Sequence, residues 1–174
     1  MTGPAGPDRH ASGRGWIETI LRYIPGFRGY LEKGYRRESD HLARKWMADR
    51  LTASKKGLDG YINDLVSDGK LDGLDQIERC RSKLDGLINS LLGAVRGYSG
   101  FFDFVQVDEA LLDKVYAHDM AMIEDVEGLA KSIETLGTKP EEVVAVAKAL
   151  RQHIDEVQKK FDIRGQLLEG IGPQ

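Results

Sequence analysis

The chain of 174 residues contains a single cysteine, Cys80. One cysteine excludes an internal disulfide framework and a zinc site built on several thiolates, and it agrees with a reducing compartment. We therefore expect a cytoplasmic protein. Because Cys80 lies beside a predicted helix seam, we interpret it as a small buried apolar group rather than a nucleophile.

Long apolar runs are also missing. No stretch approaches the ~20 apolar residues that a membrane span requires, and the N-terminus lacks the apolar core of a secretory signal. Residues 1–15 are rich in glycine and proline and have few large apolar groups, so we expect a disordered tail there. A single domain over 16–170 is predicted to follow.

Recognisable catalytic motifs are absent as well. The sequence has no nucleophilic triad, no glycine-rich phosphate loop and no evident pair of catalytic carboxylates. We therefore predict a protein that is not an enzyme and needs no cofactor.

Apolar residues recur instead at helical spacing, and no segment alternates as a strand would. A short amphipathic helix over 16–24 ends at Pro25-Gly26, and four long helices are predicted over about 29–67, 72–98, 107–136 and 140–168. Gly137 and Thr138 are expected to cap the last boundary. The sequence thus predicts an all-α fold, four long antiparallel helices in an up-down-up-down bundle, with a dimerising helical hairpin as the alternative.

Two charged residues, Arg81 and Asp119, fall on the apolar seams. An unpaired charge is costly there, so we expect each to find a partner and to fix the register of the helices. Folding the chain at its turns places Asp119 level with Leu51, Asn89 and Asp155. Replacing Asp119 by Leu is then expected to stabilise the protein or to leave its stability nearly unchanged.

One end of the predicted bundle is basic and aromatic. Residues 8–50 contain ten basic and six acidic side chains, a net charge of +4, whereas the whole chain carries −3. Antiparallel pairing brings this segment to the loop around residues 98–104, where four aromatics occur in seven positions. The predicted partner-binding residues are Trp16, Arg22, Phe27, Arg28, Tyr30, Arg36, Arg37, Phe101, Phe102 and Phe104.

Several interpretations of this end stay open. The aromatic loop is either an exposed patch for a partner protein or a plug that closes the bundle. The helix over 16–24 either packs on the bundle or attaches the protein to an anionic membrane surface. Nucleic acid is an unlikely partner because acidic residues interrupt the basic run, and a homo-oligomer is possible.

A metal site is a weaker alternative. The expected pairing of the last two helices brings His118 and Asp119 to the level of His153 and Glu156, a set that could hold one zinc-like ion. The competing interpretation is that both histidine rings pack beside the seam and hydrogen-bond.

Two stretches resemble a bacterial or archaeal all-helical protein family that is uncharacterised. The first runs from Ile24 to Lys33 and continues with Arg36–Asp40, and the second combines Gly97–Asp103 with Leu112, Asp113, Tyr116 and Asp119. The resemblance implies a bacterial or archaeal cytoplasmic protein and carries no activity or ligand. Together with the patterns above, it leads us to expect a non-enzymatic protein-interaction or scaffold module.

Overall fold

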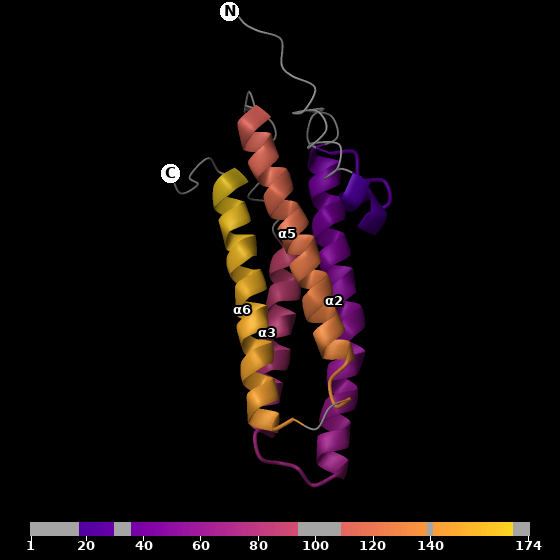
Figure 1. The fold of residues 1–174 in the computed structure, drawn as a ribbon, viewed down its shortest axis with the longest axis vertical. Coiled ribbons are helices and arrows are strands. Elements are labelled where there is room, and N and C mark those ends of the chain that lie inside the picture. The colour runs from indigo at the N-terminus through magenta and orange to yellow at the C-terminus, as the bar shows by residue number, and fades with distance from the viewer. Residues whose placement is uncertain (1–17, 30–35, 94–108, 139–140, 169–174) are drawn as a thin grey trace, which may run out of the picture.

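The computed structural model describes residues 18–29, 36–93, 109–138 and 141–168 (Figure 1). Four long helices occupy most of these ranges: α2 (Arg36–Ser67), α3 (Leu74–Gly93), α5 (Glu109–Glu134) and α6 (Val143–Leu168). A short helix over 18–23 precedes them, and no strand occurs within the described ranges. The predicted all-α bundle with a short leading helix is confirmed, while the predicted tail over 1–15 lies outside the described residues.

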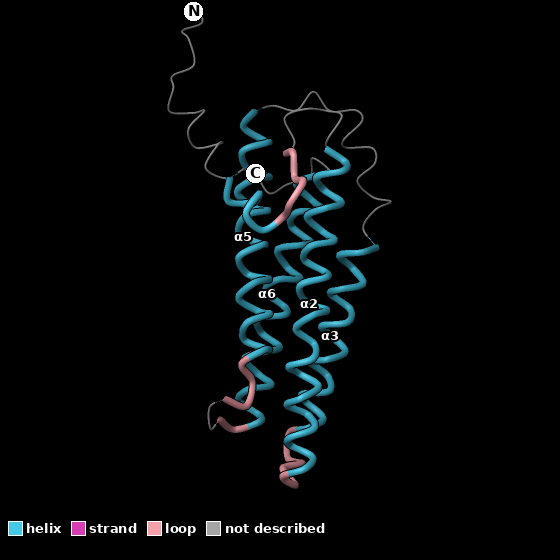
Figure 2. Tube along the Cα trace, turned by 90° about the vertical axis from the view of Figure 1, so that its right-hand side faces the viewer, coloured by secondary structure: helices cyan, strands magenta, loops and turns pink. Residues whose placement is uncertain are grey.

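The four long helices pack as a square. Helix α2 contacts α3 and α5, and α6 contacts the same two helices, so α3 and α5 lie across a diagonal. Consecutive helices run in opposite directions, as expected (Figures 1 and 2). The diagonal order nevertheless makes α2 and α5 parallel neighbours, and α3 and α6 likewise. We call the end where α2 and α5 begin the upper end, and the opposite end the lower end.

The predicted seams form the core. Seam residues of α2 such as Met47, Leu51 and Leu58 are at most 1% exposed, and the other helices contribute matching apolar stripes. The buried seam residues of the other three helices are Ile77, Leu84, Ile88, Leu91, Val115, Met122, Val126, Leu129, Ile133, Ala147, Leu150, Ile154, Val157 and Phe161. Removing this much apolar surface from water is the main force that holds the helices together.

The turn between α2 and α3 closes on a left-handed glycine. Gly69 has φ +68°, its N–H donates to the Val66 carbonyl at 3.1 Å, and the Lys70 N–H donates to the Leu65 carbonyl at 2.9 Å. These two bonds satisfy the last carbonyls of α2 and stop the helix where the sequence predicts.

The turn between α5 and α6 differs from the prediction. Thr138 does not cap α6, because its hydroxyl donates to the Thr135 carbonyl at 2.7 Å and helps to close the turn after α5. Helix α6 begins only at Val143. The later start shifts the pairing of α5 with α6, and Asp119 meets Arg164 rather than Asp155.

Candidate functional site

The short helix over 18–23 lies on the bundle at the upper end. Ile20, Ile24 and Phe27 are at most 2% exposed, and the ring of Tyr23 meets Trp46 edge-on with 5.5 Å between centroids. The backbone N–H of Arg28 donates to the Ser39 hydroxyl at 3.2 Å. The apolar face of this segment is therefore buried against the long helices.

The predicted partner-binding residues are distributed unevenly over this end. Phe27 belongs to the core and offers no surface to a partner in this conformation, whereas Arg22 and Arg28 are exposed. Arg36 and Arg37 lie in the first turn of α2, but their side chains are outside the described part of the chain. Trp16, Tyr30, Phe101, Phe102 and Phe104 also lie outside it.

The four residues considered for a metal site do not converge. His118 donates from Nε2 to the Lys160 carbonyl at 2.6 Å, while His153 lies beside Gly128, further along α5. Asp119 is bonded to Arg164, and Glu156 is exposed and accepts a hydrogen bond from Gln152. In the ranges that the structure describes, no three His, Cys, Asp or Glu side chains are arranged to hold a metal ion.

Beneath the upper end lies a network of four buried charged side chains, which we call the buried charge network: Asp40, Arg44, Asp119 and Arg164. Each is at most 3% exposed. Arg164 of α6 forms a bidentate ion pair with Asp119 of α5. Its Nε donates to Oδ1 at 2.5 Å, and its Nη2 donates to Oδ2 at 3.1 Å. Its Nη1 lies 2.7 Å from Oδ1 of Asp40 on α2.

Arg44 continues this network toward α3. Its Nε donates to Oδ2 of Asp40 at 2.9 Å, and its Nη1 donates to the Leu91 carbonyl at 3.0 Å. Two guanidinium groups thus balance two carboxylates, and the contacts reach all four long helices. Burying charges is tolerable only with such pairing, because desolvation of an isolated ion costs several kcal/mol.

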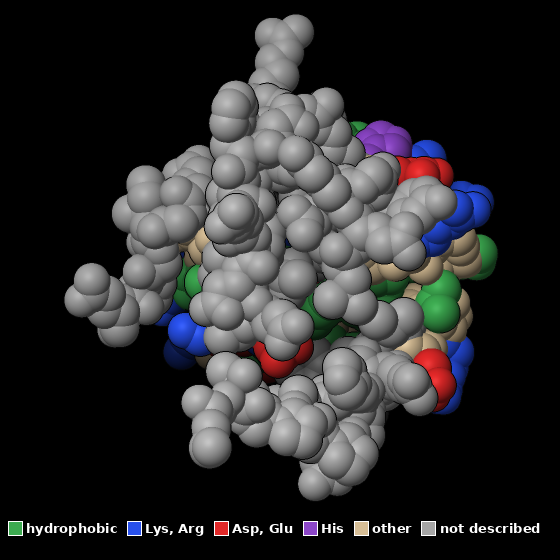
Figure 3. Space-filling view, turned by 90° about the horizontal axis from the view of Figure 1, so that it is seen from above, with side chains coloured by type: hydrophobic (Ala, Val, Ile, Leu, Met, Phe, Trp, Pro, Cys, Tyr) green, Lys and Arg blue, Asp and Glu red, His purple; other side chains and the backbone are tan. Residues whose placement is uncertain are grey.

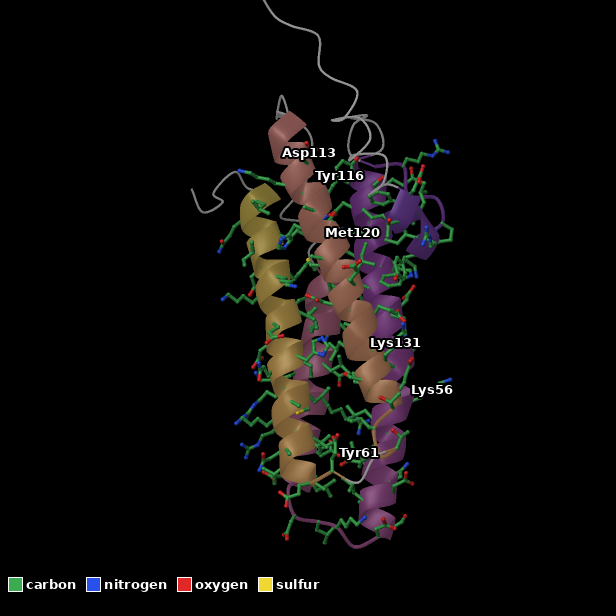
Figure 4. The ribbon with its side chains drawn as sticks, in the orientation of Figure 1. Lys56, Tyr61, Asp113, Tyr116, Met120 and Lys131 are labelled. Carbon is green, nitrogen blue, oxygen red and sulfur yellow. The ribbon has the colours of Figure 1, made fainter. Side chains whose placement is uncertain are left out.

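Residues near the buried charge network link it to the segment after the short helix. Tyr116, one turn before Asp119 on α5, is 3% exposed, and its hydroxyl lies against Gly29 (Figure 4). Gly29 has φ +82°, so a side chain there would be strained as well as blocked by Tyr116. Asp40 and Asp119 therefore meet through Arg164, and Tyr116 lies one turn from Asp119 on α5.

The sequence analysis missed Arg44 and Arg164 as buried residues. Both lie on seams when the apolar spacing is continued, since Arg44 precedes Met47 by three positions and Arg164 follows Phe161 by three. Long basic side chains usually lie at the surface, and this tendency hid the signal. Arg81, the other charge placed on a seam, is half-exposed, and its Nη2 lies 3.4 Å from Oδ1 of Asp59 on α2.

The lower end carries a groove of about 1130 Å³ between the α2–α3 turn and the start of α6. Its walls include Tyr61 and Leu65 of α2, Leu71 of the turn, and Val143 and Val144 of α6. A smaller hollow of about 390 Å³ shares the lining residues Tyr61, Gly137, Thr138 and Glu141 with it. We call the larger one the lower groove.

The lower groove is acidic. Among the described residues, five carboxylates and one ammonium group line it: Asp64, Asp68, Asp72, Glu141, Glu142 and Lys70. Lys70 pairs with Asp68 at 3.1 Å. The pKa of Tyr61 is raised, mainly by burial and further by the charge of Glu141, so the hydroxyl group senses the negative potential.

An ion cluster also joins α2 to α5 on the surface. Arg50 lies between two glutamates, with Nε 2.7 Å from Glu127 Oε2 and Nη1 2.5 Å from Glu134 Oε1. These hydrogen bonds lower the pKa of both carboxyl groups. The cluster stabilises the parallel contact of the two helices.

Cys80 is buried, as predicted, at 1% exposure. Its thiol donates to the Ala147 carbonyl at 3.3 Å, and burial raises its pKa. A thiol held in the protonated form is a poor nucleophile.

Within the described ranges, no helix combines enough length with enough apolar character to cross a bilayer. Comparisons with protein-family models, with curated proteins and with solved structures find no match to the chain.

Proposed function

We propose that the protein is a non-enzymatic scaffold that acts in the cytoplasm by binding another protein through the upper end of the bundle. The observation that carries this proposal is the buried charge network directly beneath that end. Paired charges in a core contribute little net stability compared with apolar side chains, but they favour one arrangement of the helices. A surface held in one geometry loses less entropy when a partner binds.

The chemistry-bearing side chains support a binding role over a catalytic one. Asp119 is bonded to Arg164, His118 is bonded to a backbone carbonyl, and the pKa of Cys80 is raised by burial. A thiol nucleophile needs a lowered pKa or an adjacent base, and a general base needs a free lone pair facing a substrate. These groups instead stabilise the fold.

The described surface over the short helix has features of a protein contact. Leu21 is 42% exposed, and the exposed cations Arg22 and Arg28 lie close to it in the chain. Figure 3 looks onto this end, where basic and acidic side chains appear around the rim. An exposed leucine next to an exposed arginine suits an acidic protein partner.

A membrane partner is less favoured by the same geometry. An amphipathic helix binds lipid through its apolar face, and Ile20 and Ile24 of that face are buried in the bundle.

The test is a surface variant that leaves the core intact, Leu21→Ser with Arg22→Glu. The matched control is Val66→Ser with Lys56→Glu, which also changes one exposed apolar residue and one exposed cation, but toward the lower end of α2. Partners are identified by cross-linking in cells and quantitative mass spectrometry. We expect the wild type and the control to capture the same partner and the upper-end variant to lose it. If the upper-end variant keeps every partner that the control keeps, the proposal fails.

A further inference from the structure

At the lower end, the bundle lacks one of its four corners. Gly57 of α2 lies against Ile133 and Glu134 at the end of α5, and Tyr61 lies against Gly137. Helix α2 continues to Ser67, which at 1.5 Å per residue extends roughly 9 Å beyond Tyr61. Figures 1 and 2 show the α2–α3 turn beyond the turn between α5 and α6.

The lower groove lies beside this extension. Its apolar walls are Tyr61 and Leu65 of α2, Leu71 of the turn and Val144 of α6. A helix placed below the end of α5 would pack on these residues as α5 packs on the upper part of α2. The groove thus has the position of a missing helical segment.

Exposed apolar side chains concentrate at this end. Of the five large hydrophobic residues in the described ranges that are exposed, three are here: Val66 at 53%, Leu71 at 61% and Val144 at 47%. Exposed apolar residues grouped around a hollow, with polar residues at its rim, mark binding surfaces more often than scattered ones do. Leu71 and Val144 line the lower groove, so an occupant would remove these two from water.

The negative charge around the lower groove favours a basic occupant. The side-chain carboxylates of Asp64, Asp72, Glu141 and Glu142 have no hydrogen bond or ion pair with any described residue. Among the described residues that line the groove, only Lys70 is basic. The carbonyl end of α2 adds a partial negative charge. An acidic or neutral helix would gain nothing from this rim, whereas lysine or arginine side chains on the flanks of an apolar face would pair with it.

We propose that the lower groove binds a lysine- or arginine-rich amphipathic helix of another protein, which occupies the fourth corner of the bundle below α5. The apolar face of that helix covers Leu71 and Val144, and its basic flanks face Asp64, Asp72 and Glu141. This is the helix-in-groove mode of recognition. The site is separate from the upper end and does not depend on the scaffold role proposed for it.

The probe is a fluorescein-labelled peptide of about 18 residues with leucines at helical spacing and lysines elsewhere, long enough to form a stable helix. The comparison peptide has the same leucines and glutamates in place of the lysines. Fluorescence anisotropy with the full-length protein measures both affinities. We expect the lysine peptide to bind, to bind more weakly as salt increases, and the glutamate peptide not to bind.

Two protein variants with equal charge loss locate the site. Asp64→Asn, Asp72→Asn and Glu141→Gln together should weaken binding about tenfold, because three exposed pairs contribute a few-fold each. Asp113→Asn, Glu124→Gln and Asp162→Asn, exposed on other surfaces, should change it less than about twofold by the same reasoning. Equal weakening by the two sets would overturn the proposal, since the peptide would then respond only to net charge. Failure of the lysine peptide to bind would also overturn it.

Two further measurements distinguish a helix of another protein from a second copy of this chain as the occupant of the lower groove. Leu71→Ser with Val144→Ser should weaken the lysine peptide, and Leu21→Ser with Arg22→Glu at the upper end should leave it unchanged. Sedimentation of the wild-type protein alone tests a second copy of this chain as occupant. Self-association that disappears in the Asp64, Asp72 and Glu141 variant would assign the groove to that second copy and overturn the proposal of a different protein.

Discussion

Asp119 and its bidentate ion pair with Arg164 determine the strongest prediction at the scale of single residues. The sequence alone suggested that Asp119→Leu would be stabilising or nearly neutral, but the structure places this carboxylate at 2% exposure against a guanidinium with no exposed surface. Leucine would leave Arg164 with one carboxylate instead of two. We expect Asp119→Leu to lower the free energy of unfolding by about 3–5 kcal/mol, measured by urea denaturation.

The control for this prediction removes both partners. Asp119→Leu with Arg164→Met leaves Asp40 and Arg44 as a balanced pair, so it should recover much of the lost stability. Asp113→Asn on the exposed side of α5 should change the stability by less than about 0.5 kcal/mol. A single variant Asp119→Leu as stable as the wild type would show that the network does not hold the core.

Arg50 gives a prediction that depends on pH. Its hydrogen bonds lower the pKa of Glu127 and Glu134 from the usual 4.5, so the folded state binds protons less readily than the unfolded state. The stabilisation is therefore fully present above pH 4.5 and is lost as the pH falls through the lowered pKa values of the folded protein. Arg50→Ala should cost about 1 kcal/mol at neutral pH.

The measurement is thermal or urea unfolding at several pH values between neutral and strongly acidic. The curves of Arg50→Ala and the wild type should begin to converge below the usual glutamate pKa and should coincide below the lowered pKa values of the folded protein, because protonation then removes the ion pairs from the wild type. Lys148→Ala, which changes an exposed cation on α6, should follow the wild type throughout. A constant difference between Arg50→Ala and the wild type at every pH would contradict this account.

At the scale of helices, the contact of α2 with α5 depends on a glycine. A Cβ atom at Gly57 would lie 2.7 Å from the Ile133 carbonyl oxygen and 2.9 Å from the Glu134 Cα, both backbone atoms. Gly60, one turn later on α2, has nothing within 4 Å of the same position. The two glycines therefore have different roles, although both lower the helix propensity of α2.

We expect Gly57→Ala to destabilise the protein by about 1–3 kcal/mol, because the clash forces the helices apart. Gly60→Ala is the matched control and should stabilise by roughly 0.5–1 kcal/mol through higher helix propensity. Differential scanning calorimetry distinguishes a fall from a rise in Tm. Two rises would mean that α2 and α5 lie further apart than described.

The sequence predicted where the helices lie along the chain better than which residues of neighbouring helices lie side by side. Seam residues such as Leu58 and Val126 are buried as expected, because helical spacing is a local signal that each segment carries alone. The prediction that Asp119 lies beside Asp155 was wrong, because Asp119 pairs with Arg164. The prediction depended on the exact length of the turn after α5. Thr138 bonds backward to Thr135, and no sequence pattern separates that bond from a cap of the next helix.

The candidate sites were predictable to different degrees. Burial of Cys80 followed from spacing. The same spacing placed Ile20 and Ile24 on the apolar face of the short helix, but it did not decide whether that face packs on the bundle. The lower groove did not, because it results from the unequal ends of two helical hairpins, and such an offset appears only when the hairpins are placed side by side. The five acidic residues around it come from two distant parts of the sequence.

At the scale of the whole molecule, Cys80 reports on global unfolding. Its thiol lies between α3 and α6 at 1% exposure, so a reagent such as DTNB reaches it only when these helices separate. We expect slow labelling that quickens in proportion to the loss of stability in Asp119→Leu. A labelling rate that is fast and equal in the two proteins would mean that the thiol is reached by a local opening.

The position of the described chain ends has a mechanical consequence. The short helix over 18–23 and the last residues of α6 both lie at the upper end (Figure 1). Tension applied between these two points would pull α6 away from its neighbours one turn at a time, so that contacts break in succession rather than all together. A bundle loaded in this way yields at lower force than one pulled from opposite ends, and its strongest resistance would come at the very start, when Arg164 is drawn away from Asp119 and Asp40.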